Sequence, residues 1–93
     1  MNTKTVTADK LLNYFRTAAI VKSLQTTLSQ LELRLTKIEE QIEQFERLGL
    51  KETVEVLAIG YNDLNLKRIK TELKIKQYEI EMLNFELVAA TRD

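Results

Sequence analysis

The sequence contains no cysteine and no histidine, and these two absences remove most of the usual catalytic and metal-binding chemistry. Without thiols the chain can form no disulfide, and without imidazoles it lacks the side chain that most often transfers protons near neutral pH. Zinc sites built from cysteine and histidine are excluded for the same reason. We therefore expect no catalytic residue, no metal ligand and no cofactor, and we predict that the chain is not an enzyme.

Proline is also absent, and glycine occurs only at Gly49 and Gly60. The 93 residues therefore contain no segment typical of a flexible linker or of a strand-and-turn fold. The composition is that of helices, and the length allows a single domain, which we place at residues 8–90. A chain of this size has difficulty burying enough apolar surface on its own, so association with another copy or another protein is expected.

Neither sign of charge is in excess, because 14 basic and 14 acidic side chains cancel. A neutral chain has no overall field to attract nucleic acid or an anionic membrane. The most apolar early segment, residues 18–24, is interrupted by Lys22 and is too short to span a bilayer. We expect a cytoplasmic protein with no membrane contact.

What the sequence does contain is a long heptad pattern in its first half. Apolar residues recur at alternating spacings of three and four, with Thr17 at the one polar step. A helix uses such a seam when a second helix lies along it. The residues of this first seam are Tyr14, Val21, Leu24, Leu28, Leu31, Leu35, Ile38, Ile42 and Phe45.

The second half repeats the pattern. Its seam residues are Leu50, Val54, Leu57, Tyr61, Leu64, Arg68, Thr71, Ile75, Tyr78, Met82, Phe85 and Ala89. Two seams of similar length that are joined at Gly49 predict an all-α fold, a long antiparallel helical hairpin of coiled-coil type. Facing positions then have numbers that add up to about 99, which places Phe85 near Tyr14 and Leu64 near Leu35.

The predicted boundaries follow from capping signals. Residues 1–7 are expected to be a disordered N-terminus, with Thr7 as the cap of a helix over 8–48. Gly49 can adopt the left-handed conformation that ends a helix, so a turn is predicted at 49–52 and a second helix at 53–90. Gly60 leaves two alternatives open, a kink in the second helix or a tolerated glycine in a continuous one.

Arg68 and Thr71 are polar positions within the second seam. In the antiparallel register they lie opposite Leu31 and Leu28, where a polar layer could fix the alignment of the helices. The alternative is an arginine that extends its charged end to solvent without any special role.

The second helix carries more apolar residues than one seam requires. At about 100° per residue the extra residues form a second stripe roughly 160° around the helix from the seam. Leu11 and Phe15 add apolar surface at the start of the first helix. We predict that these residues form an interface in which two hairpins pair into a homodimeric four-helix bundle, with a site for a different protein as the alternative. The stripe consists of Leu66, Ile69, Leu73, Ile80, Leu83 and Leu87.

Two charged surfaces are further candidates. Glu39, Glu40, Glu43 and Glu46 form a candidate acidic surface for a partner near the turn. Lys67, Lys70 and Lys74 share one face of the second helix and are the candidate contact for nucleic acid. Charge runs on helices are more often solvated faces, and no aromatic residue lies among the lysines.

In outline the chain resembles the secreted WXG100 class of helical hairpins, because Arg47, Leu48 and Gly49 occupy the turn where that class has Trp-x-Gly. The tryptophan is missing, and Tyr78 is followed four residues later by Met82 instead of an acidic residue. Type III needle subunits and phage scaffolding proteins share the same hairpin outline. The resemblance implies a secreted or scaffold-like structural protein as one alternative.

The favoured hypothesis is a non-enzymatic protein-protein interaction module that acts through the helical surfaces of an oligomeric hairpin. Small helical chains without cofactors are often adaptors, inhibitors or assembly factors, including those that phages and mobile elements encode. A small nucleic-acid-binding regulator that uses the basic face of the second helix is the runner-up.

Overall fold

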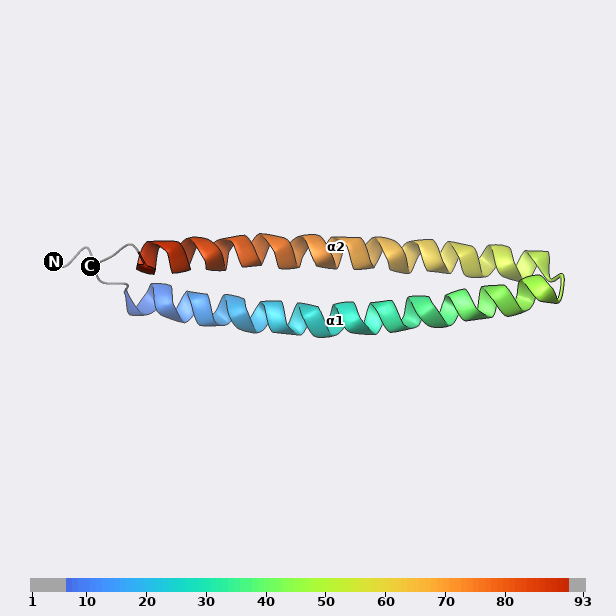
Figure 1. Ribbon diagram of the computed structural model, residues 1–93, viewed down its shortest axis with the longest axis horizontal. Coiled ribbons are helices and arrows are strands. Elements are labelled where there is room, and N and C mark those ends of the chain that lie inside the picture. Colours follow the sequence, from blue (N-terminus) through green and yellow to red (C-terminus); the bar gives the residue numbers. More distant parts are fainter. Residues whose placement is uncertain (1–6, 91–93) are drawn as a thin grey trace.

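The computed structural model describes residues 7–90, and within this range the chain is all-helical. Helix α1 comprises Ala8–Arg47 and helix α2 comprises Lys51–Ala90, each with 40 residues. The helices lie side by side and antiparallel, so the start of α1 and the end of α2 are at the same end of the molecule (Figure 1). This open end and the turn lie at opposite ends of an extended hairpin that measures 72 × 15 × 15 Å.

Helix α1 begins at the cap that the sequence predicts. The backbone of Thr7 is extended, and its Oγ1 accepts a hydrogen bond of 3.2 Å from the backbone N–H of Lys10. Asp9 lies in the first turn, where its charge interacts favourably with the positive end of the helix dipole. The rest of the predicted disordered N-terminus, residues 1–6, lies outside the described residues.

Helix α1 ends in a turn that depends on Gly49. This residue has a φ of +73°, in the left-handed region where other residues are strained. The N–H of Leu50 donates to the carbonyl of Phe45 at 3.0 Å, and the N–H of Gly49 donates to the carbonyl of Glu46 at 3.1 Å. These two hydrogen bonds form a Schellman motif, which satisfies carbonyls at the end of α1.

The turn is shorter than the predicted 49–52, since it comprises residues 48–50. Because Gly49 takes the left-handed position, Leu48 is the capping residue and α1 ends at Arg47 instead of residue 48. The carbonyl of Leu50 already accepts a hydrogen bond from the N–H of Val54, so α2 begins at Lys51 instead of residue 53. Of the two alternatives at Gly60, the structure shows the continuous helix.

The core lies along the two predicted seams. Leu31, Leu35 and Leu64 form a buried cluster, with Ile38 and Tyr61 packed against it. Leu35 with Leu64, and Ile38 with Tyr61, are pairs whose numbers add up to about 99, as the antiparallel register requires. Val21 and Ile75 are also buried. The seam residues Leu50 and Ala89 are exposed, because no further layer covers the last positions of a two-helix contact.

The open end of the hairpin follows the same register. The rings of Tyr14 and Phe85 are stacked, with centroids 4.6 Å apart and planes inclined by 24°. Stacked aromatic pairs at this distance stabilise a contact beyond the apolar area that they bury. The alignment of the two helices predicted from the heptads is therefore the one in the structure.

The hairpin leaves much of its surface accessible. Its accessible area is 7400 Å², whereas a compact monomer of 10.8 kDa would expose about 5,500 Å². No described residue is fully buried. A single layer of two helices thus gives each helix only one covered stripe.

Candidate functional site

The candidate site is the exposed apolar face of α2, which we call the outer face. Its six predicted residues are all exposed, with relative accessibilities between 40% and 58%. They lie roughly 160° around the helix from the seam residues that contact α1. A row of exposed apolar side chains of this kind on a small protein usually marks an interaction site. The residues of the outer face are Leu66, Ile69, Leu73, Ile80, Leu83 and Leu87.

The outer face extends further toward the turn than the stripe predicted from the sequence. Ile59 is 64% exposed and lies one heptad before Leu66. The signal that could have revealed it is this spacing of seven residues, which continues through the whole face. Val56 is also exposed nearby.

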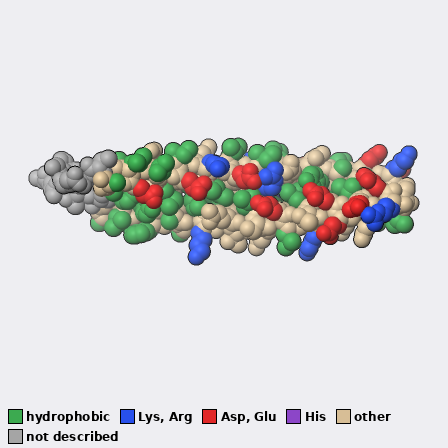
Figure 2. All heavy atoms as spheres, in the orientation of Figure 1, with side chains coloured by type: hydrophobic (Ala, Val, Ile, Leu, Met, Phe, Trp, Pro, Cys, Tyr) green, Lys and Arg blue, Asp and Glu red, His purple; other side chains and the backbone are tan. Residues whose placement is uncertain are grey.

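The two predicted interface residues of α1, Leu11 and Phe15, are also exposed. They lie at the open end of the hairpin because their neighbour Tyr14 stacks on Phe85 near the end of α2. Figure 2 shows hydrophobic side chains spread over the part of the visible surface nearer the grey termini, while charged side chains gather toward the turn. The structure therefore concentrates apolar surface from both helices toward the open end.

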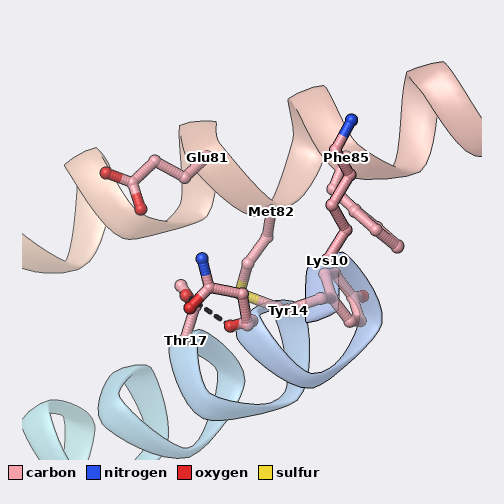
Figure 3. Close-up of a pocket in the computed structure, with 7 residues that line it drawn as sticks. Lys10, Tyr14, Thr17, Glu81, Met82 and Phe85 are labelled. Atoms are coloured by element: carbon pink, nitrogen blue, oxygen red, sulfur yellow. Dashed lines mark hydrogen bonds between the residues drawn. The ribbon is translucent and has the colours of Figure 1, made fainter. Parts of the chain in front are cut away.

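A shallow groove separates α1 and α2 at this end (Figure 3). It encloses about 160 Å³. The hydroxyl of Thr17 donates to the carbonyl of Asn13 at 2.9 Å, so this polar group is already satisfied within α1. The lining of the groove comes from both helices. The lining residues are Lys10, Asn13, Tyr14, Thr17, Glu81, Met82 and Phe85.

Two hydrogen bonds join tyrosines of one helix to glutamates of the other. Tyr14 of α1 donates to Oε1 of Glu86 at 3.0 Å, and Tyr61 of α2 donates to Oε1 of Glu39 at 2.7 Å. Each hydrogen bond to a carboxylate raises the pKa of its tyrosine above 10.0, and partial burial and the carboxylate charge act in the same direction. At Tyr61 the charge of Arg68 acts against this increase.

The two heptad seams alone do not predict either of these contacts. In each case the glutamate follows the seam residue opposite the tyrosine, so the numbers of the bonded pair add up to about 100. This relationship could have been found from the predicted register.

Arg68 does not form a polar bridge to α1 in the structure. Its Nε donates to Oδ1 of Asn65 at 3.0 Å, and its NH1 donates to Oε1 of Glu72 at 2.6 Å, both within α2. The side chain is 28% exposed. Thr71 donates to the carbonyl of Lys67, also within α2. Of the two alternatives for Arg68, the structure shows the one in which the charged end of the side chain extends toward solvent.

The charged candidates all lie on the surface. The acidic surface of Glu39, Glu40, Glu43 and Glu46 is exposed beside the turn. Within it Glu43 forms an exposed ion pair of 2.7 Å with Arg47, an interaction that contributes little stability. Lys67, Lys70 and Lys74 are exposed on α2 and lie along one edge of the outer face.

Residues 7–90 contain no group of three or more acidic side chains placed to hold a metal ion. Over the same residues, neither helix combines the length and the apolar character that crossing a membrane requires. Comparison of the chain with protein-family models, curated proteins and solved structures finds no match. Its function therefore has to be inferred from its own surfaces.

Proposed function

We propose that this chain is a non-enzymatic protein-protein interaction module, an adaptor, inhibitor or assembly factor that works as an oligomeric hairpin. The outer face of α2 is its principal interface, and the first partner of that face is a second copy of the chain. A different protein is then bound by the remaining helical surfaces.

The observation that carries the proposal is the exposure of six large apolar side chains of α2 opposite its contact with α1. Covering exposed leucine and isoleucine side chains contributes roughly 25 cal/mol of favourable free energy for each Å² of apolar area that an interface removes from water. A hairpin with five buried apolar residues has little core of its own, so covering this face also stabilises the fold.

The other surfaces support binding rather than chemistry. Thr7 caps α1, and Tyr14 and Tyr61 donate hydrogen bonds that join the two helices. The zero net charge favours a protein partner over a polyanion.

The test is the molar mass in solution, measured by light scattering behind a sizing column, for the wild type and for Leu83→Asp. We expect a dimeric wild type and a helical but monomeric variant, because an aspartate at Leu83 would bury a charge in the interface. Circular dichroism checks that the variant remains helical.

Leu33→Asp is the matched control. Leu33 is an exposed leucine on α1, 59% accessible, and it receives the same substitution outside the outer face. It should remain dimeric like the wild type. Equal molar masses for the wild type, Leu83→Asp and Leu33→Asp would contradict the assignment of the outer face as the interface.

A further inference from the structure

The exposed residues of α2 form a second complete heptad seam, which we call the outer seam. Ile59, Leu66, Leu73, Ile80 and Leu87 recur at every seventh residue. Ile69 and Leu83 occupy the intermediate positions, and so do Asn62, Lys76 and Ala90. All ten residues are exposed. A seam of alternating three and four residues is the pattern that another helix fits, so the missing neighbour of α2 is a helix.

That helix must offer an apolar stripe of similar length. The exposed large hydrophobic residues of α1 are Leu11, Leu12, Phe15, Ile20 and Leu33. They gather near the start of α1, and between Ile20 and Leu33 its outward surface has none. Within the described residues, α2 itself is the helix that carries a matching stripe.

We propose that a second copy of this chain covers the outer seam, with α2 packed antiparallel against α2 of the partner and the two-fold axis passing between Leu73 and Lys76. The inference rests on the proposed function and specifies its first partner. The outer seam is about 47 Å long and a helix about 10 Å wide, so two copies cover on the order of 1,000 Å², the lower limit for a specific interface.

Large apolar residues face each other at four positions of the outer seam in this register. Facing positions have numbers that add up to about 149. Leu66 then faces the partner's Leu83, and Ile69 faces the partner's Ile80. The symmetric pairs repeat these contacts on the other side of the axis, while Leu73 faces the partner's Lys76 and Leu87 faces the partner's Asn62.

The polar residues of the outer seam decide between the two directions. In the antiparallel pair, Lys76 lies beside the partner's Glu72 and Asn62 lies beside the partner's Glu86. In a parallel pair in register, Lys76 would face the partner's Lys76, and this like-charge contact would oppose association. Charge complementarity therefore favours the antiparallel direction.

The edge around the two-fold axis is electrically balanced. Each copy brings the carboxylates of Glu72 and Glu79 and the cations of Arg68 and Lys76 to it. The 2.6 Å ion pair between Arg68 and Glu72 is already formed within one copy. The basic residues Lys67, Lys70 and Lys74 lie on the opposite edge, away from this cluster.

The angle between the seams sets the shape of the dimer. In a square four-helix bundle the two neighbours of a helix lie about 90° apart, whereas the two seams of α2 are about 160° apart. The four helices therefore form a flat row in the order α1, α2, partner's α2, partner's α1. This arrangement leaves the outer surface of α1 and the acidic turn open to a different protein.

Cysteine variants provide the test, because the chain has no cysteine of its own. Leu66→Cys and Leu83→Cys are prepared separately, mixed, and exposed to mild oxidation. We expect a disulfide between the two different variants and none within either variant alone, because residue 66 faces residue 83 of the other copy. Disulfides within each single variant would show parallel pairing and would overturn the inference.

A charge reversal checks the polar contacts. Lys76→Glu should raise the dimer dissociation constant about tenfold or more by placing a fifth and sixth carboxylate among the four at the axis. Lys74→Glu makes the same change two residues away on the opposite edge and should have a much smaller effect. Equal effects of the two variants would contradict the register.

The outcomes also separate this inference from the proposed function. In one outcome the wild type is a dimer and Leu83→Asp dissociates it, but the mixed cysteine variants form no disulfide. This result supports the outer face as an interface and overturns the pairing of α2 with the partner's α2. A wild type that is monomeric at all concentrations overturns the inference that a second copy covers the seam.

Discussion

The hydroxyl of Tyr61 in α2 donates a 2.7 Å hydrogen bond to a carboxylate oxygen of Glu39 in α1. The same relationship recurs at the open end, where Tyr14 of α1 donates to Glu86 of α2 at 3.0 Å. In both cases the ring packs in the seam and the hydroxyl reaches the edge of the other helix. These tyrosines thus connect the apolar core to the polar flank, and their protonation is linked to the stability of the hairpin.

We predict that the hairpin loses stability when Tyr14 and Tyr61 ionise. Their pKa values are raised above 10.0 in the folded chain, so the folded state holds these protons more tightly than the unfolded state. The stabilising contribution is complete below about pH 10 and is lost as the pH rises through the raised pKa values. Thermal unfolding followed from about pH 8 to about pH 11 measures this loss.

The control for this prediction is the double variant Tyr14→Phe, Tyr61→Phe, which retains both rings and all lysines. Its melting temperature should fall less steeply above about pH 10 than that of the wild type, because the phenols no longer titrate. Parallel curves for the two proteins would show that the tyrosine hydrogen bonds do not contribute to the pH dependence.

Gly60→Ala should stabilise the hairpin. Gly60 lies inside the continuous helix α2, and an added Cβ would meet no atom within 4 Å. Alanine is favoured over glycine in a helix interior by about 0.5–1 kcal/mol. Urea unfolding at constant protein concentration measures the change.

Gly49→Ala is the matched comparison and should have the opposite effect. An added Cβ at Gly49 also has space, but the φ of +73° is strained for alanine by about 1 kcal/mol. If both substitutions destabilised the hairpin equally, the continuous helical conformation at Gly60 would be in doubt.

Leu31→Asp should abolish the folded hairpin. Leu31 is buried in the central cluster with Leu35 and Leu64. Removing its apolar contacts costs about 2–5 kcal/mol, and the buried carboxylate adds a further cost. Circular dichroism should show lost helicity for Leu31→Asp but retained helicity for Leu83→Asp. Equal helicity in the two variants would mean that the seam and the outer face have been assigned to the wrong sides.

We expect no measurable binding of DNA or RNA at low salt. Lys67, Lys70 and Lys74 are the candidate contact, and fluorescence anisotropy with single-stranded and duplex probes tests it. A complex whose affinity falls steeply with salt would support the nucleic-acid alternative. In that case, replacing the three lysines by glutamine should reduce the slope of log affinity against log salt concentration by about three, because about three phosphate contacts are lost.

The overall hairpin could be predicted from the sequence because heptad spacing maps directly onto the faces of a helix. The two seams, the cap at Thr7 and the left-handed Gly49 follow from local geometry, and the stacked pair of Tyr14 and Phe85 follows from the antiparallel register. The alignment of the helices also follows from the sequence, because Gly49 fixes where the chain reverses and the two seams then meet in pairs whose numbers add up to about 99.

Other features depended on the tertiary structure, because they require the distances between side chains. The sequence left open whether Gly60 breaks the helix and whether Arg68 bridges to α1. It also predicted that the turn ends at residue 52, whereas in the structure the turn ends at residue 50. The hydrogen bonds of Tyr61 and Arg68 are decided by how far each side chain reaches once the helices are packed. The heptads of the sequence therefore determined the fold and the existence of two apolar stripes, whereas only the packed hairpin decided which polar groups meet across the helices and which surface stays exposed.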